Sequence, residues 1–214
     1  MKNLLAILTM LLTFGAVQTT AQAEDKLDPA IVQLQHDWAR VNYQVPEKAQ
    51  EEAFKALTEQ AHQVTANSPN QPEAMIWEAI VLSGYAKAKG GLGALKYAEK
   101  ARDLLLEAEK LNPQALHGSA YTTLGSLHYK VPGWPIGFGN KKKAKAYLEK
   151  ALQMNPTGID PNYFYADFLL EQGDKAGAIE YFNKALAAPA RPGREDADAG
   201  RKRDIEAGLK RAQE

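Results

Sequence analysis

The sequence predicts an all-α fold in which helix pairs stack side by side into a solenoid. Two observations carry this prediction: prolines that end helical stretches recur along the chain, and the stretches before them have apolar residues at helical spacing. The prolines are Pro69, Pro113, Pro156 and Pro189, separated by 44, 43 and 33 residues. A period of roughly 20 to 50 residues is typical of repeat proteins, in which each unit buries its apolar face against its neighbours.

The composition indicates a globular protein held together by packing alone. The 214 residues include 26 Lys and Arg, 26 Asp and Glu, and no Cys, and 45% of them are apolar. This apolar content with a formal charge of zero is not that of a disordered chain. Neutrality also argues against a nucleic-acid partner, since binders of nucleic acid need a basic excess against phosphate. The lack of Cys excludes disulfides, Cys-based zinc sites and thiol chemistry.

Residues 1–23 have the pattern of a secretory signal peptide. Lys2 is followed by an uncharged apolar run of 14 residues, and the motif Ala21-Gln22-Ala23 precedes charged residues. A retained anchor is the alternative, but the run is shorter than the roughly 20 residues that span a bilayer. We therefore expect a periplasmic protein that begins at Glu24 and is not stably inserted in a membrane. Without a Cys it is not a lipoprotein.

Residues 24–70 form a degenerate N-terminal helix pair or cap in this interpretation. A first helix is expected around Ile31 to Tyr43, and a second begins at Pro46 and ends before Pro69. Few small residues mark where these helices pack, so no repeat register follows for them.

The repeat region, residues 71–192, begins with a loose unit. Trp77 and Ile80 lie on its first helix, and the glycine-rich stretch 90–93 breaks the chain before the second helix. That second helix carries small and bulky residues in register, namely Ala101, Leu105 and Ala108. The glycine-rich stretch has no preceding strand and no following Gly-Lys-Ser/Thr, so it indicates a helix break rather than a phosphate loop.

The next unit has a clear register and an insertion. The residues in register are Tyr121, Leu124 and Gly125 on the first helix, Ala144, Leu148 and Ala151 on the second, and Pro156 at the end. Gly125 and Ala144 are 19 residues apart, whereas the corresponding Ala166 and Ala178 of the last unit are 12 apart. Seven residues are therefore inserted between the paired helices.

Residues 160–192 form the most regular unit. Asp160 is expected to cap its first helix, which ends near Gly173, and a second helix covers 175–187. Small residues stand where the antiparallel helices approach closely and bulky ones fill the space around them: Ala166, Ala178 and Ala185 are small, and Tyr165, Leu169 and Phe182 are bulky. Residues 193–214 then predict a highly charged C-terminal capping helix, since a solenoid needs a polar outer cap.

Ala166, Ala178, Phe182 and Ala185 resemble the tetratricopeptide repeat, which has these residue types at these offsets, and only its terminal proline is displaced, to Pro189. The wider tract around them also resembles exported bacterial tetratricopeptide proteins. The resemblance implies a right-handed superhelix of helix pairs that rarely performs chemistry and binds partners on a concave face. The Lys and Asn set with which some members clamp a C-terminal carboxylate is missing, so that activity is not expected.

By the geometry of the resembled family, first-helix residues that do not pack on their partner helix line the concave face. These candidates are hydroxylic, aromatic, aliphatic or acidic: Ser119, Thr122, Ser126 and Tyr129 in one unit, and Tyr163, Asp167, Leu170 and Glu171 in the next. We expect a protein or peptide partner to bind there.

The insertion, residues 131–140, is the second candidate site. It contains two prolines, three glycines and the large apolar residues Trp134, Ile136 and Phe138. Trp134 and Phe138 either present an aromatic contact to a partner, since aromatic residues often dominate interfaces, or cover the neighbouring repeat.

A run of lysines follows the insertion behind the expected helix cap Asn140, and its members are Lys141, Lys142 and Lys143. Cations in a first helical turn oppose the helix dipole, at about 0.3 to 1 kcal/mol each when exposed. These lysines either face an anionic or acidic partner surface or are ordinary solvated residues.

The sequence has no pattern for catalysis, a metal or a cofactor. The four His include no pair at i, i+4, and His117 and His128 are 11 residues apart, which is about 16 Å along a helix and too far to share a metal. No nucleophile is accompanied by a base. We expect a protein that is not an enzyme and has no cofactor.

The sequence thus predicts a periplasmic adaptor that binds an envelope protein or peptide through its concave face and the Trp134 loop. The alternative is a small-molecule-binding accessory subunit of a solute transport system, with Tyr129, Trp134, Tyr163 and Phe164 around a pocket. An enclosed pocket would favour the alternative, and a flat open groove would count against it. The sequence names neither a particular partner nor an oligomeric state.

Overall fold

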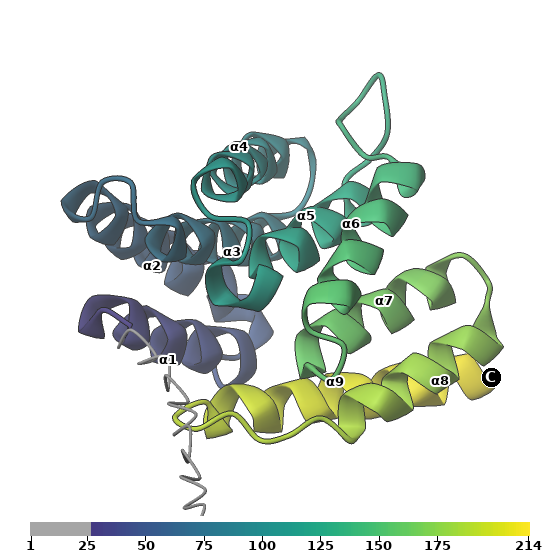
Figure 1. Ribbon diagram of the computed structural model, residues 1–214. Coiled ribbons are helices and arrows are strands. Elements are labelled where there is room, and N and C mark those ends of the chain that lie inside the picture. The colour runs from purple at the N-terminus through teal and green to yellow at the C-terminus, as the bar shows by residue number, and fades with distance from the viewer. Residues whose placement is uncertain (1–26) are drawn as a thin grey trace, which may run out of the picture.

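A computed structural model describes residues 27–214, and this part of the chain forms nine α-helices (Figure 1). The prediction of an all-α fold is confirmed. The signal peptide predicted for residues 1–23 lies outside the described residues. Between residues 27 and 214, no helix combines the length and the apolar character needed to cross a membrane.

The helices follow one another with mostly short connections. Their bounds are α1 Pro29–Tyr43, α2 Glu47–Asn67, α3 Pro72–Lys89, α4 Leu95–Leu111, α5 Ser119–Lys130, α6 Lys141–Met154, α7 Ile159–Glu171, α8 Lys175–Leu186 and α9 Glu195–Gln213. Two 3₁₀ turns, η1 (Leu92–Ala94) and η2 (Ala115–Gly118), precede α4 and α5. The ten residues 131–140 between α5 and α6 form the connection that contains the predicted seven-residue insertion.

Side-chain caps fix several of the helix starts. Asn140 accepts a hydrogen bond from the amide of Lys143 at 2.9 Å, as expected, and Asp174 accepts one from Gly177 at 2.9 Å. The prediction that Asp160 caps α7 is wrong. The helix begins two residues earlier than predicted, after Gly158, so Asp160 lies in the first turn and its carboxylate binds arginines instead.

Within each repeat, small residues let paired helices approach and bulky residues fill the remaining space, as predicted. Ala166, Ala178 and Phe182 are fully buried between α7 and α8. In the preceding pair, a Cβ on Gly125 would stand only 2.5 Å from Cγ of Leu148, so the register needs glycine there. The small and bulky positions read from the sequence are therefore in contact.

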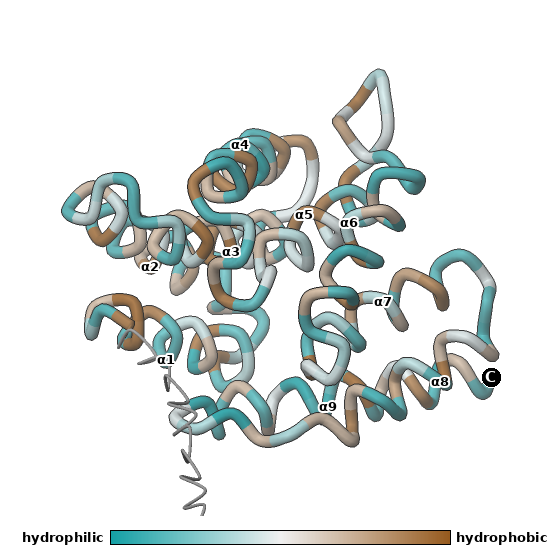
Figure 2. The backbone as a smooth tube through the Cα atoms, viewed as in Figure 1, coloured by the Kyte–Doolittle hydropathy of each residue, from teal (hydrophilic) through white to brown (hydrophobic). Residues whose placement is uncertain are grey.

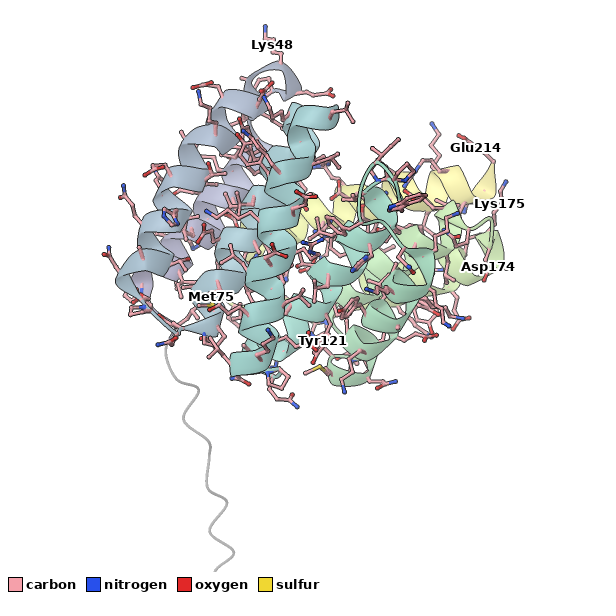
Figure 3. All side chains as sticks on the ribbon, turned by 90° about the horizontal axis from the view of Figure 1, so that it is seen from above. Lys48, Met75, Tyr121, Asp174, Lys175 and Glu214 are labelled. Carbon is pink, nitrogen blue, oxygen red and sulfur yellow. The ribbon has the colours of Figure 1, made fainter. Side chains whose placement is uncertain are left out.

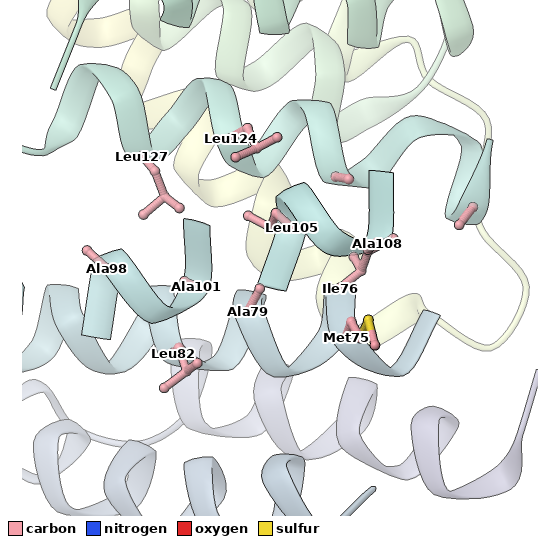
Figure 4. Close-up of a cluster of buried hydrophobic side chains, with 12 residues drawn as sticks. Met75, Ile76, Ala79, Leu82, Ala98, Ala101, Leu105, Ala108, Leu124 and Leu127 are labelled. Atoms are coloured by element: carbon pink, nitrogen blue, oxygen red, sulfur yellow. The ribbon is translucent and has the colours of Figure 1, made fainter. Parts of the chain in front are cut away.

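The largest apolar cluster joins α3, α4 and α5 (Figure 4). Leu105 of α4 and Leu124 of α5 are fully buried in it, next to Ile76 of α3. The hydropathy colouring shows hydrophobic and hydrophilic stretches alternating along the helices (Figure 2), and the apolar residues of this cluster are buried. The loose unit of residues 71–113 thus packs as a full member of the solenoid.

The two ends of the solenoid touch, which the sequence does not predict. Helix α9 packs on α7 and α8, as a capping helix does, and also on α1 (Figure 1). It starts beside α1, and its C-terminal residue Glu214 lies near Lys175 of α8 (Figure 3). A Cβ on Gly200 would stand 2.2 Å from the ring of Tyr43, so α9 reaches α1 only because this position has no side chain. The helices therefore form a closed ring.

Candidate binding cavity

A cavity of about 1180 Å³ fills the middle of the ring. Its wall is formed mainly by α1, α3, α5 and α7, by one face of α9 and by the segment that precedes α9. The helices α3, α5 and α7 are the first helices of the predicted repeats, so the cavity corresponds to the concave face. Because α9 meets α1, this face is bounded on all sides of the ring rather than open along a groove.

Five of the predicted concave-face residues line the cavity: Ser119, Thr122, Ser126, Tyr163 and Asp167. Tyr129 does not, because its side chain is buried against Phe168 and its hydroxyl donates a hydrogen bond to Asp167 at 2.9 Å. Glu171 is also outside the cavity wall, and its carboxylate pairs with Lys130. Tyr129 and Glu171 therefore support the wall from behind.

One side of the wall is a network of charges between α7, the segment before α9, and α9. Asp160 binds Arg191 Nη1 at 2.6 Å and Arg201 Nε at 2.8 Å. Arg201, which is only 7% exposed, also binds Asp204 at 3.0 Å. Burial alone would raise the pKa of Asp160, but the charges of Arg201 and Arg191 outweigh burial and hold that pKa well below its usual range. The network ties the last repeat to α9.

The network continues across the closure to α1. The hydroxyl of Tyr43 donates a hydrogen bond to Asp204 at 3.1 Å, and His36 Nδ1 lies 3.2 Å from a carboxylate oxygen of Asp196. Burial raises the pKa of Tyr43, with a smaller contribution from Asp204 of the same sign. Polar contacts thus join helices that lie some 160 positions apart in the chain.

A second charged group lies at the other end of α9. Asp167 accepts from Tyr129 and pairs with Lys130 Nζ at 2.7 Å and with Arg211 at 3.1 Å. Burial would raise the pKa of Asp167, but Lys130 outweighs it and the pKa is lowered. Next to it, burial raises the pKa of Tyr163 to about 12. The carboxylate is therefore ionised and fully engaged, which suits a wall residue better than a catalytic base.

Aromatic rings form the part of the wall next to the first of these charge networks. Trp38 of α1 and Trp77 of α3 meet edge to face at 6.1 Å, and the guanidinium of Arg194 lies 5.0 Å above the Trp77 ring. The sequence predicts Trp77 only as a helix-packing residue and indicates no role for Trp38 or Arg194. Their place in the cavity depends on the ring closure, and no local pattern in the sequence signals that closure.

The predicted loop residues have different positions. Trp134 is 90% exposed and lies outside the cavity wall. Phe138 packs on the fold, edge to face with His128 at 5.3 Å and under the guanidinium of Arg102 at 4.6 Å. The position of Phe138 therefore fits the alternative role of covering the neighbouring repeat and does not support a contact with a partner. The exposed lysines Lys141, Lys142 and Lys143 open α6 at the base of the loop.

No group of three or more His, Asp or Glu side chains stands close enough to hold a metal within residues 27–214. His128 is buried between Tyr147 and Phe138. Burial, assisted by Lys143, lowers its pKa, so at neutral pH it is an uncharged packing residue. The described cavity thus offers binding groups of several kinds. Its carboxylates Asp160 and Asp167 are paired with cations, whereas Lys87 and Arg194 also line it and form no ion pair with the described residues.

Comparisons with known proteins agree with this architecture. Residues 136–194 match the tetratricopeptide repeat family. A thermophilic TPR protein of Thermus thermophilus has a similar structure, with a TM-score of 0.56, 16% identity, and 86% of this chain and 97% of that chain covered. Two weaker structural matches are MamA (TM-score 0.44, 17% identity, 78% and 90% covered) and pilF of Pseudomonas aeruginosa (0.35, 19%, 84% and 87%). No curated protein matches the sequence. The predicted tetratricopeptide-type solenoid is confirmed as the fold.

Proposed function

We propose that this tetratricopeptide-type solenoid is a non-enzymatic binding module that holds a peptide segment of a partner protein in its central cavity. Solenoids of this type bind proteins in general. The observation that best supports the proposal is the cavity of about 1180 Å³ on the concave side. Hydroxyl groups on α5, such as those of Ser119 and Ser126, offer hydrogen bonds to a peptide backbone. Trp38, which is half-buried in the wall, offers apolar contact to its side chains.

The closure of the ring favours a second candidate, a small molecule as ligand. A cavity bounded by helices from both ends of the solenoid shields a ligand more than an open groove does, and its volume is close to the roughly 300 to 1,000 Å³ typical of small-molecule pockets. The module would then be the accessory subunit of a solute transport system. Both candidates use the same cavity, so one pair of variants tests them together.

The experiment compares Ser126→Phe, which narrows the cavity, with Ser68→Phe at the C-terminus of α2, outside the cavity wall. Each protein is used as bait in an envelope extract and is separately denatured for mass spectrometry of released small molecules. A protein retained by wild type and Ser68→Phe but lost by Ser126→Phe supports the peptide ligand. A small molecule with that behaviour supports the second candidate. Equal retention by all three baits contradicts both.

We also propose the periplasm as the compartment of this module. The support is the sequence pattern of residues 1–23, with its apolar run and its Ala21-Gln22-Ala23 motif. The test is the intact mass of the protein released from the periplasm of the producing cells. A mass that corresponds to a chain beginning at Glu24 is expected, and a full-length chain retained in the cytoplasm would contradict the proposal.

A further inference from the structure

Large exposed apolar side chains are concentrated at one edge of the ring. In residues 27–214 four of them are prominent, and three of these, Leu92, Trp134 and Ile136, lie on the α3–α4 and α5–α6 connections. They are 76%, 90% and 57% exposed, and the fourth, Leu111, is 44% exposed at the end of α4. We call the three side chains the apolar tip.

The two connections that carry the apolar tip are neighbours in space. The side chain of Leu95 lies against the insertion, since a Cβ on Gly137 would stand 3.3 Å from its Cδ2. Leu92 and Ile136 both border the same cavity. The insertion projects away from the ring beside the α3–α4 connection (Figure 1). The apolar tip therefore lies on two neighbouring connections at one edge of the ring.

The insertion is held in its outward position by its own contacts. The amide of Gly139 donates to the carbonyl of Pro132 at 2.9 Å, and the amide of Asn140 donates to the carbonyl of His128 at 2.7 Å. Phe138 anchors the base of the loop on the fold. Trp134 is thus presented to solvent by an ordered loop, although its ring has apolar surface to bury.

The chain around the apolar tip carries positive charge. Residues 79–98 and 110–148, which include both connections, contain no Asp or Glu. Lys89 and Lys130, at the ends of α3 and α5, are nevertheless paired with carboxylates of other helices, those of Glu51, Asp167 and Glu171. Lys141, Lys142 and Lys143 follow the insertion directly, are exposed, and form no ion pair with any residue of the described chain. In the first turn of α6 they also oppose the helix dipole. The three lysines therefore give this edge unpaired positive charge.

We propose that this edge docks on an anionic phospholipid bilayer, with Trp134 and Ile136 at headgroup depth and the three lysines against the lipid phosphates. Tryptophan partitions to the headgroup region, and juxtaposed lysines are attracted by anionic lipid. The three side chains of the apolar tip offer far less than the roughly 1,000 Å² that a stable protein interface buries, which favours the bilayer over a protein partner. The contact is peripheral and places the cavity border near the membrane surface.

The test is sedimentation with vesicles of equal parts phosphatidylglycerol and phosphatidylcholine, compared with phosphatidylcholine alone. The protein is purified as the cells release it, and each variant is checked by mass for the same N-terminus. Trp134→Ala is matched by Leu111→Ala. The variant with Lys141, Lys142 and Lys143 changed to Ser is matched by one with Lys175, Lys202 and Lys210 changed to Ser, which removes equal charge from α8 and α9.

Wild type is expected to bind the anionic vesicles and not the neutral ones. Each lysine near an anionic surface changes the partition coefficient by about fivefold. The partition coefficient should therefore fall about a hundredfold in the variant with Lys141, Lys142 and Lys143 changed to Ser, and about tenfold in Trp134→Ala. The matched controls should bind as wild type does. Brominated lipid should quench the fluorescence of wild type more than that of Trp134→Phe.

Three results would overturn the proposal. Wild type that fails to bind anionic vesicles excludes the docking itself. If the variants at Trp134 and at the three lysines lose no more vesicle binding than their matched controls, the binding would depend on net charge and not on this edge. Binding without a difference in quenching between wild type and Trp134→Phe would remove the apolar tip from the contact.

Discussion

The repeats α5 to α8 and the closure between α1 and α9 are held together by different forces. In the repeats, neighbours in sequence pack through small and bulky apolar residues, as Gly125 does with Leu148. At the closure, helices from opposite ends of the chain meet through His36 and Asp196, through Tyr43 and Asp204, and over the bare backbone of Gly200. Apolar packing therefore sets the form of each unit, and polar contacts set how the row of units ends.

The largest loss of stability is expected where a buried apolar side chain of a repeat is truncated. Leu148 is fully buried between α5 and α6, so Leu148→Ala should lower the free energy of unfolding by about 2 to 5 kcal/mol. Chemical denaturation measures this difference. Leu152→Ala, on the same helix but only half-buried, is the control and should cost clearly less. Equal costs would mean that the register of this repeat is misassigned.

A smaller but more localised effect is expected at the closure. Arg201→Met removes the cation that binds both Asp160 and Asp204, and charged hydrogen bonds of this kind contribute about 1.5 to 3 kcal/mol. Amide hydrogen exchange should become faster in α1 and α9 while α5 and α6 keep their protection. Lys202→Met, on the exposed side of α9, is the matched control. Uniform loss of protection along the chain would contradict a separate closure.

Acid should weaken the closure before the repeats. The pKa values of Asp160 and Asp167 are lowered in the folded protein, so their contribution to stability is complete above the ordinary value of 3.8 and is lost as the pH falls below it. Unfolding midpoints measured from about pH 6 down to about pH 2 should therefore fall in the acid range. Asp160→Asn should reduce that slope, and an unchanged slope would show that the charge network contributes little.

The smallest effect is expected at the apolar tip. Trp134 is 90% exposed, so Trp134→Ala should change the free energy of unfolding by less than about 0.5 kcal/mol. Thermal melting of the variant beside wild type measures this. A larger loss would show that the Trp134 ring contributes to folding, and the vesicle experiment would then need Trp134→Phe in its place.

The contrast between the repeats and the closure also explains which parts of the structure can be predicted from the sequence. Ala166, Ala178 and Phe182 are local signals, because their spacing alone reports which helix faces meet, and the unit built on them has its predicted ends within a residue or two. Part of the cavity wall follows from the same register, through Ser119, Ser126 and similar first-helix residues.

The rest of the cavity wall is not predictable by such reasoning. Arg201 and Asp204 look like the solvated charges of any polar helix, since they stand three residues apart on a strongly charged segment. Only contacts with helices far away in the chain, such as that of Asp204 with Tyr43, give them a different role, and a single sequence contains no periodic signal for that pairing. Trp38 likewise belongs only to a cap in the prediction, because nothing local indicates that its helix borders a cavity.

The contact of Gly200 with Tyr43 has a consequence for how this architecture can change its length. An open row of helix pairs can gain or lose a unit at little cost, and its outermost units fray first because each has one neighbour. In this protein the last helix packs on the first, so no unit is outermost. Adding or deleting a helix pair would move α9 out of contact with α1. The close contact at Gly200 therefore fixes the number of units, and with it the size of the cavity.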